Sequence, residues 1–274
     1  MLQAAAAVLL EEGITEYGIL PISEVRVTYA DLFSRDGDFS PKSVLMYAVP
    51  YYTGLGENLS AYAVSRDYHL YMQSLSARLI AAVNAVYPHA TLRAFADHSP
   101  IDERHAAARA GLGRLGDNGL LITPRYGTFV FVGELFSDIP APQGGTVYEI
   151  EGCEHCGACR RACPTGALSG CGDCLSELTQ RRGDLAPETV RLMKKHHTVW
   201  GCDLCQTACP HTRRAIADGV VTPVAFFREE RIPLLDSARL SAMDKVSFKT
   251  RAFAWRGRRV VERNLKAYET EDVT

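Results

Sequence analysis

Seven of the nine cysteines in this 274-residue chain fall into two closely spaced runs. The first run is Cys153-x2-Cys156-x2-Cys159-x3-Cys163-Pro164, and the second is Cys202-x2-Cys205-x3-Cys209-Pro210. In a C-x2-C-x2-C loop three thiolates surround one iron–sulfur cluster, whereas the cysteine before proline ligates the neighbouring cluster. The spacing therefore predicts two linked [4Fe–4S] clusters, whose chemistry is electron transfer.

Each cubane cluster needs four thiolates, so the ligands can be divided by counting. For cluster one we expect Cys153, Cys156, Cys159 and Cys209. The second run has Val199 where its first cysteine would stand, so a more distant thiolate must complete cluster two. Its expected ligands are Cys163, Cys202, Cys205 and either Cys171 or Cys174. Structural zinc also uses C-x2-C pairs, but it does not account for the two x3-Cys-Pro endings.

The composition excludes some classes of partner. The formal net charge is −2, so no overall field attracts the chain to nucleic acid or to a membrane surface. No stretch reaches the roughly 20 apolar residues of a membrane span. The apolar start of the chain lacks a basic leader, which favours an amphipathic helix over a signal peptide. Reduced thiols and clusters predict a cytoplasmic protein.

The elements that must position the clusters and any active site are mixed. Short apolar runs predict strands over residues 43–49, 91–96 and 128–132. Apolar side chains at three-to-four spacing predict one long helix within 59–86, ended by Pro88. A further helix is expected to begin at Ser99, with Pro100 in its first turn, and to end at Gly111.

We therefore expect three parts, which are a mixed α/β domain over 1–148, a ferredoxin-like cluster domain over 149–215, and a basic extension over 216–274. Within the extension, residues 249–266 interleave seven Lys and Arg residues with Phe248, Phe253 and Trp255. This pattern predicts either a face that binds a polyanion or an ordinary solvated helix face.

Known cofactor motifs are incomplete in the first part. Gly111-Leu112-Gly113-Arg114-Leu115-Gly116 has the spacing of a dinucleotide loop but follows a helix, so it reads as a turn. Asp67-Tyr68-His69 begins like the cobalamin-binding D-x-H-x-x-G pattern, yet Met72 stands where glycine is needed. A corrinoid would therefore not take His69 as its lower ligand by that route.

Seven ordered segments carry a resemblance to a known family. They are 62–69 (YAVSRDYH), 96–104 (ADHSPIDER), 108–113 (ARAGLG), 116–122 (GDNGLLI), 126–135 (YGTFVFVGEL), 174–179 (CLSELT) and 201–210 (GCDLCQTACP). Together they resemble the epoxyqueuosine reductases over roughly residues 40–212, with a weaker match at Arg263-Asn264.

The resemblance implies a fold and a reaction. The fold would be α+β, with a nitroreductase-like and reductive-dehalogenase-like α/β core that binds a corrinoid, joined to a ferredoxin-like double [4Fe–4S] module. The enzyme would use cobalamin and the two clusters to reduce epoxyqueuosine to queuosine in tRNA. Its electrons would come from a low-potential donor such as flavodoxin or ferredoxin. The chain would be a short form without the family's C-terminal helical-repeat domain.

The resemblance also assigns residues. It implies Asp97 as the acid that protonates the leaving oxygen, and Tyr62, Arg66, His69, Asp97, Leu121 and Ser176 as cobalamin contacts. It selects Cys174 as the fourth ligand of cluster two and leaves Cys171 spare. Because Asp97 follows Phe95 and Ala96, we expect burial to raise its pKa. The alternative role for Asp97 is to cap the helix that follows.

The chain departs from the family at several positions. Asp117 stands where lysine is usual, His211-Thr212 where Trp-Asn is usual, and Glu177 where tyrosine is usual. Two other functions fit the same cysteine pattern. One is a different corrinoid-dependent reductase, which dehalogenates a substrate or reactivates a corrinoid protein, and the other is an electron-transfer protein. Bound corrinoid would exclude the last of these.

Overall fold

The strand expected over residues 43–49 is the centre of the fold. In the computed structural model, which describes residues 1–35, 37–143 and 145–270, it is β2 (Ser43–Pro50), and all eight of its residues are buried. It lies in a four-stranded antiparallel sheet of order β1-β2-β6-β3. The other strands are β1 (Tyr17–Pro21), β3 (Leu92–Ala96) and β6 (Val130–Ser137).

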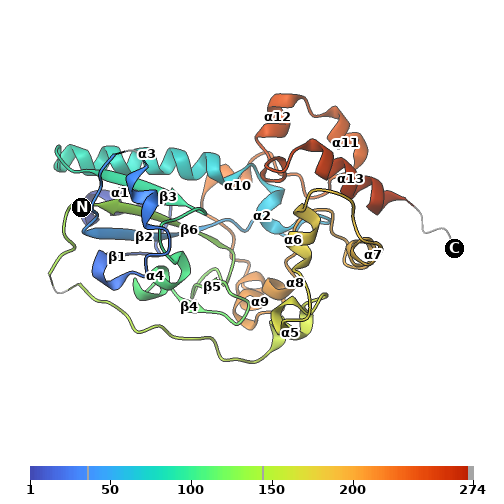
Figure 1. Cartoon of the computed structure of the whole chain (residues 1–274), viewed down its shortest axis with the longest axis horizontal. Helices are drawn as coiled ribbons and strands as arrows, with labels where there is room; N and C mark the ends of the chain where they lie inside the picture. The colour runs from blue at the N-terminus through green and yellow to red at the C-terminus, as the bar shows by residue number, and fades with distance from the viewer. Residues whose placement is uncertain (36, 144, 271–274) are drawn as a thin grey trace.

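Both faces of the sheet are covered, which is why β2 is apolar at nearly every position. Leu45, Tyr47 and Val49 point to one core, which α1 (Leu2–Glu11) and α3 (Tyr68–Val86) complete. The alternate residues of β2 point to a second core, which includes the alanines of α4 (Glu103–Arg109). Figure 1 shows the long helix α3 along one side of the sheet.

Two helix predictions were wrong in their bounds. The helix expected within 59–86 is divided into α2 (Ala61–Val64) and α3, because the Asp67 carboxylate accepts a hydrogen bond from the His69 N–H and starts α3 afresh. The helix expected from Ser99 begins only after Asp102, whose side chain accepts from the His105 N–H. Ser99 instead closes a turn before the helix, because its hydroxyl donates to the buried Glu134 side chain and its Oγ accepts from the Ile101 N–H at 3.2 Å.

The two chain regions 111–122 and 149–217 are built from short elements. The expected glycine turn carries a small hairpin, formed by β4 (Arg114–Leu115) and β5 (Leu121–Ile122). The cysteine region contains α5 (Ala158–Ala162), α6 (Leu175–Gln180), α7 (Pro187–Lys195), α8 (Leu204–Thr207) and α9 (Pro210–Ala217). Elsewhere in the described part of the chain, and within the cysteine region, 3-10 turns occur at η1 (Ile22–Glu24), η2 (Ala30–Ser34), η3 (Ala167–Ser169) and η4 (Ala252–Ala254).

The last part of the chain forms a third core. Its helices are α10 (Ala225–Arg228), α11 (Ser237–Ala242), α12 (Lys245–Lys249) and α13 (Arg258–Glu269). Phe248 and Phe253 are buried in this core together with Trp200. Arg251 is also buried and donates to the carbonyl oxygens of Val64 and Glu230. Of the three aromatic residues expected beside the basic residues of 249–266, Phe248 and Phe253 are buried in this core and Trp255 is exposed, so the expected face is only partly at the surface.

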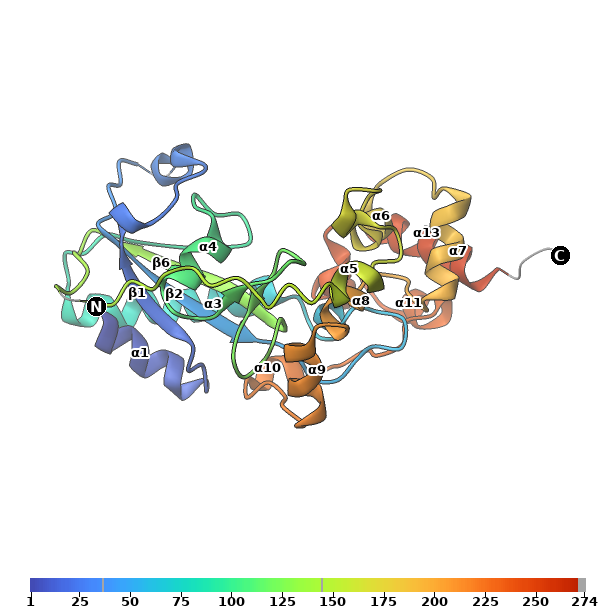
Figure 2. The same cartoon turned by 90° about the horizontal axis from the view of Figure 1, so that it is seen from below.

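Figures 1 and 2 show the sheet with α1, α3 and α4 at one end of the molecule and α6, α7, α11 and α13 at the other, with α5, α8 and α9 near the middle. No helix among the described residues is long and apolar enough to cross a membrane. The boundaries expected near residues 148 and 215 stay predictions.

Candidate functional site

Four cysteines line one cavity near the middle of the molecule. They are Cys153, Cys156, Cys159 and Cys209, the set expected for cluster one. All nine cysteines are free thiols. Asn118 lines the same cavity, and its side-chain nitrogen is buried without a hydrogen-bond partner among the described residues. A buried amide donor needs an acceptor, and the sulfur of a cluster can supply one. The cavity therefore fits an iron–sulfur cluster.

Short elements hold these thiols. Cys159 lies in α5, which begins after Gly157 with a positive φ of 71°. Cys209 precedes Pro210 at the start of α9, so its backbone turns directly into a helix. The Cys153 N–H donates to the Leu115 carbonyl oxygen at 2.9 Å, which ties the first cysteine to the β4–β5 hairpin.

The thiols expected for cluster two also lie together. Cys202 is close enough to Cys163 and Cys174 for their charges to interact, and Cys205 interacts with Cys202 and Cys174. Burial, reinforced by these neighbours, raises the pKa of Cys202 to about 11 and that of Cys205 to about 12. Cys171 and Cys174 are both exposed, but the Cys171 Sγ donates to the nearby Ser169 carbonyl oxygen at 3.6 Å, whereas Cys174 lies with Cys202 and Cys205. This arrangement supports Cys174 as the fourth ligand.

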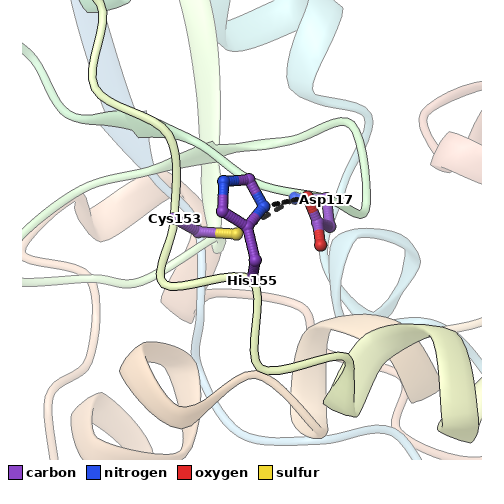
Figure 3. Close-up of side chains that lie close together, drawn as sticks. All are labelled: Asp117, Cys153 and His155. Atoms are coloured by element: carbon purple, nitrogen blue, oxygen red, sulfur yellow. Dashed lines mark hydrogen bonds and ion pairs between the residues drawn. The ribbon is translucent and has the colours of Figure 1, made fainter.

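Two histidine–carboxylate pairs lie around the cluster-one cavity. His155 Nδ1 is 2.8 Å from Asp117 Oδ1, and the Asp117 N–H donates to Cys153 Sγ at 3.4 Å (Figure 3). His211 Nε2 is 2.7 Å from Glu154 Oε2. Asp117 and His211, two of the positions at which we expected this chain to differ from the family that it resembles, thus each have a local partner. Asp117, Cys153 and His155 could together approach a metal ion, but Cys153 places that group within the cluster-one site.

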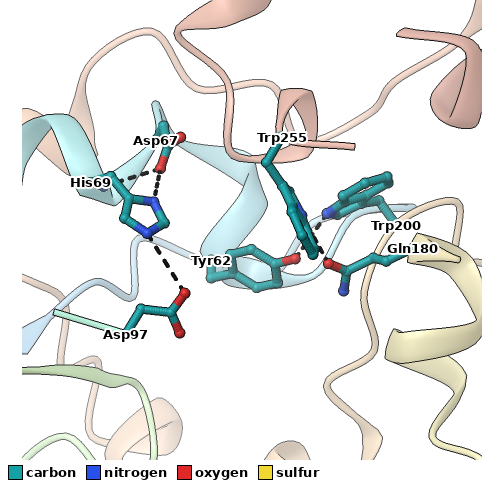
Figure 4. Close-up of polar contacts among 7 residues, drawn as sticks. All are labelled: Tyr62, Asp67, His69, Asp97, Gln180, Trp200 and Trp255. Atoms are coloured by element: carbon teal, nitrogen blue, oxygen red, sulfur yellow. Dashed lines mark hydrogen bonds and ion pairs between the residues drawn. The ribbon is translucent and has the colours of Figure 1, made fainter. Parts of the chain in front are cut away.

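Asp97 ends strand β3 beside the first turn of α3. Its φ is 70°, a left-handed conformation that is uncommon for residues with a side chain. His69 Nε2 is 3.7 Å from Asp97 Oδ2, and His69 Nδ1 is 2.9 Å from Asp67 Oδ1 (Figure 4). The imidazole ring thus lies between two carboxylates from different elements.

The pKa expected for Asp97 was wrong in direction. The hydrogen bond with His69 lowers the pKa of Asp97, and this outweighs the effect of burial. The hydrogen bonds to Asp67 and then Asp97 raise the pKa of His69 to about 9. Near neutral pH the ring is therefore an imidazolium between two carboxylates. Such a group holds a proton beside an exposed carboxylate and can deliver it to an oxygen atom.

A second carboxyl pair lies beneath the Asp97 loop and was not found from the sequence. Glu134 of β6 is fully buried, and Oε2 accepts from Ser99 Oγ at 2.6 Å. Glu103 Oε1 accepts from the Asp97 N–H at 3.1 Å. Burial raises the pKa of Glu103 to about 7 and that of Glu134 well above its usual range. The sequence feature that could have revealed this pair is Glu134, a glutamate in the otherwise apolar run VFVGELFS.

Two of the other residues expected to contact cobalamin, Tyr62 and Arg66, have polar partners near the His69–Asp97 pair. Tyr62 accepts a hydrogen bond from Trp200 Nε1 at 2.8 Å and is close enough to Asp67 and Asp97 to feel their charges. Arg66 pairs with Glu229 and Glu230. Figure 4 shows Tyr62 between the His69–Asp97 pair and the Trp200–Gln180 side. Tyr62, His69 and Asp97 are thus brought together.

Leu121 and Ser176 lie on other elements. Leu121 is buried in β5 as part of the second core. Ser176 Oγ, in α6, accepts from Gln180 Nε2 at 3.0 Å. The cobalamin contacts expected of Leu121 and Ser176 stay predictions.

Comparisons with known proteins bear on the cluster region, the family and the fold. A family model described as a 4Fe-4S double cluster binding domain matches residues 152–212. An epoxyqueuosine reductase of Staphylococcus aureus is 32% identical over 207 residues, which cover 73% of this chain and 53% of that protein. One of Listeria monocytogenes is 31% identical over 263 residues, covering 89% of this chain and 66% of the relative. The chain thus spans between half and two thirds of their length.

A solved structure shares the fold over most of the chain. It is an epoxyqueuosine reductase with an epoxyqueuosine-modified tRNA stem loop, at a TM-score of 0.75 and 21% identity. The match covers 97% of this chain and 80% of that structure. The expected combination of an α/β core like that of the epoxyqueuosine reductases with a double-cluster domain is confirmed as a fold.

Proposed function

The chain belongs to the epoxyqueuosine reductase family, and we propose that it reduces the epoxide of epoxyqueuosine in tRNA to the alkene of queuosine. The observation that carries this proposal is the His69 imidazolium held against Asp97 in a chain that also has a double-cluster domain. A proton source and an electron path are the two things that this reduction needs. The similar proteins of Staphylococcus and Listeria are both named for the reaction.

The chemistry balances with two electrons and two protons. Both carbon–oxygen bonds of the epoxide break, a carbon–carbon double bond forms, and the oxygen leaves as water. Two clusters suit this reaction because each passes one electron at a time. Bound cobalamin would supply a reduced cobalt that reacts with the epoxide carbon, which the side chains of a protein cannot do.

We assign the cofactor residues as follows. Cluster one takes Cys153, Cys156, Cys159 and Cys209, and cluster two takes Cys163, Cys174, Cys202 and Cys205. Cobalamin is contacted by Tyr62, Arg66, His69, Asp97, Leu121 and Ser176. The cavity lined by the first four cysteines and the mutual proximity of the second group support the cluster assignments.

His69 and Asp97 protonate the departing oxygen as a pair. The proton rests on the imidazole ring near neutral pH, because the neighbouring carboxylates raise the His69 pKa. As negative charge develops on the oxygen, Asp97 accepts the Nε2 proton and passes it on from its exposed carboxylate, and the ring then takes the second proton from solvent and delivers it by the same route. Asp67 holds the ring through Nδ1 and fixes its orientation.

The electron donor would be a low-potential protein such as flavodoxin or ferredoxin, because a two-cluster chain needs single electrons from outside. We place the protein in the cytoplasm, where thiols stay reduced.

The test is a turnover assay with both cofactors loaded. The protein is reconstituted anaerobically with iron, sulfide and cobalamin, reduced with a strong one-electron reductant, and given a tRNA anticodon arm that carries epoxyqueuosine. Mass spectrometry of the nucleosides should show loss of one oxygen atom from the modified base. No conversion by fully loaded protein would contradict the proposal and would favour a different corrinoid-dependent reductase.

A further inference from the structure

An open cavity of about 590 Å³ lies between the loop after α6 and the start of α13. Its charged lining residues are Arg182, Asp184, Arg256, Arg258, Arg259 and Arg263. Five guanidinium groups thus face one carboxylate, in a chain whose overall net charge is negative. This local excess of positive charge distinguishes the cavity from the rest of the molecule and fits an anionic ligand.

Two of the arginines build the wall. Arg258 donates to the carbonyl oxygens of Leu240 and Met243, and Arg263 donates to those of Arg181 and Gly183. Carbonyl partners fix a guanidinium without neutralising its charge. The other three, Arg182, Arg256 and Arg259, have no carboxylate within ion-pair distance in the part of the chain that the structure describes. Their charges are therefore available to a ligand.

An exposed tryptophan adjoins the arginines. Trp255 is 55% exposed, whereas Trp200 is fully buried. The Arg256 guanidinium carbon lies 3.7 Å from the centre of the Trp255 ring. The indole Nε1 donates to Gln180 Oε1 at 3.1 Å, which holds the ring in one orientation (Figure 4). An indole ring held in one orientation and exposed to water leaves apolar area unburied, and a second flat ring stacked on it would cover that area.

The tryptophan is connected to the candidate active site. Gln180, which orients Trp255, also donates from Nε2 to the hydroxyl oxygen of Ser176. Figure 4 shows Trp255 on one side of Tyr62 and the His69–Asp97 pair on the other. A ligand that reacts at Asp97 and extends past Tyr62 would meet Trp255 first and the arginine cavity next.

We propose that Trp255 and the arginine cavity bind RNA beside the reacting nucleoside, with a base stacked on the indole and a backbone phosphate among Arg182, Arg256 and Arg259. This inference rests on the proposed function for the choice of RNA. Each nucleotide offers one flat ring and one phosphate, which matches an exposed indole next to unpaired guanidinium groups. An acidic peptide would use the arginines but would have no need of the ring.

The test measures RNA binding rather than turnover. The probe is a fluorescently labelled RNA hairpin with the length of a tRNA anticodon arm and no modified base, and its anisotropy is followed as cluster-loaded protein is added at several salt concentrations. Combining Arg182→Gln, Arg256→Gln and Arg259→Gln should weaken binding and reduce the log–log salt slope by about two to three. Trp255→Ala should weaken binding roughly 5- to 150-fold, the range expected for one stacked base.

Matched variants separate the site from general effects. Trp255→Phe keeps a stacking ring and should retain most of the affinity. Arg191→Gln removes an exposed charge that pairs with Glu188 on α7, outside the cavity, and should leave affinity and salt slope unchanged. Iron content of each variant reports whether the fold and the clusters are intact.

The outcomes distinguish this inference from the proposed function. Unchanged affinity in the triple arginine variant, or equal affinities for Trp255→Ala and the unmutated protein, would overturn it even if epoxyqueuosine is reduced. A triple arginine variant that loses affinity for heparin as much as for RNA, while Trp255→Ala leaves both affinities unchanged, would indicate a general polyanion surface. That result would likewise overturn the inference. The expected losses without any turnover would support the RNA site and refute the reaction.

Discussion

His69 bridges two carboxylates, with Nδ1 2.9 Å from Asp67 Oδ1 and Nε2 3.7 Å from Asp97 Oδ2. The side chain that we expected to be protonated is therefore ionised, and the proton lies on its neighbour. A general acid can be a pair of groups, provided that the proton is held within reach of the substrate. This relationship determines how the reaction should depend on pH.

Turnover should fall as the pH rises through about 9, the value to which the two carboxylates raise the pKa of His69. Below that pH the ring carries the proton, and above it the pair has none to give. Because the Asp97 pKa is lowered, its own protonation should not shape the profile near neutrality. His69→Gln should lower turnover and abolish the alkaline decline. A decline that persists in this variant would assign it to another group.

Asp97→Asn should reduce turnover by about 10² to 10⁴, the usual effect of losing a general acid. Asparagine is a matched replacement because it keeps the shape of the side chain and tolerates the left-handed backbone at φ 70°. Iron and cobalamin content should stay unchanged. Near-normal turnover in a fully loaded Asp97→Asn protein would leave Asp97 with only a structural role in its loop.

Glu103 offers a prediction about stability. Burial raises its pKa from 4.5 to about 7, so the folded protein holds a proton that the unfolded chain releases at lower pH. A carboxyl group with a raised folded-state pKa makes the protein less stable as the pH rises between those two values. Glu103→Gln should therefore flatten the fall in melting temperature between about pH 4.5 and 7. Glu262→Gln on the exposed face of α13 is the control and should leave the slope unchanged.

Local patterns were sufficient for much of the fold. Strands β2 and β3 followed from short apolar runs, and α3 from its three-to-four spacing, because burial imposes those periods directly. The strand expected over 128–132 was found, but it begins at Val130 and continues to Ser137. The two cysteine sets followed from ligand spacing, since a cluster constrains neighbouring thiols along the chain. Helix starts were less predictable. Ser99 has the properties of a cap, but its Oγ accepts from the Ile101 N–H in a turn that precedes the helix, and Asp102 is the residue that caps α4.

The electrostatics of the site could not be predicted because they depend on which distant residues meet. Phe95 and Ala96 indicated an apolar setting for Asp97, yet α3 places His69 against its carboxylate. Arg251 and Phe253 matched a surface pattern, but the third core takes both. A local pattern of charged and aromatic residues shows which side chains are present, but whether each side chain is exposed depends on tertiary packing.

Cys174 and Cys171 form a matched pair for testing cluster two. Loaded protein should contain about eight iron and eight sulfide per chain, the content of two cubanes. Cys174→Ala should lose one cluster, because its thiol lies with those of Cys202 and Cys205. Cys171→Ala should lose none, since its thiol bonds only the nearby Ser169 carbonyl oxygen. The reverse result would reassign the ligand.

Bound cobalamin should have no histidine as its lower cobalt ligand. The D-x-H-x-x-G pattern that would supply one fails at Met72, and this methionine is buried in the first core, where it supports α3. Both ring nitrogens of His69 also face carboxylates, and the raised pKa keeps the ring protonated near neutrality, so neither nitrogen has a free lone pair for a metal. The EPR spectrum of the Co(II) form should therefore lack nitrogen superhyperfine splitting at pH 7. Splitting that is present in the unmutated protein and absent in His69→Ala would show that the imidazole leaves Asp97 to bind cobalt, and it would also remove the proton that we assign to the pair.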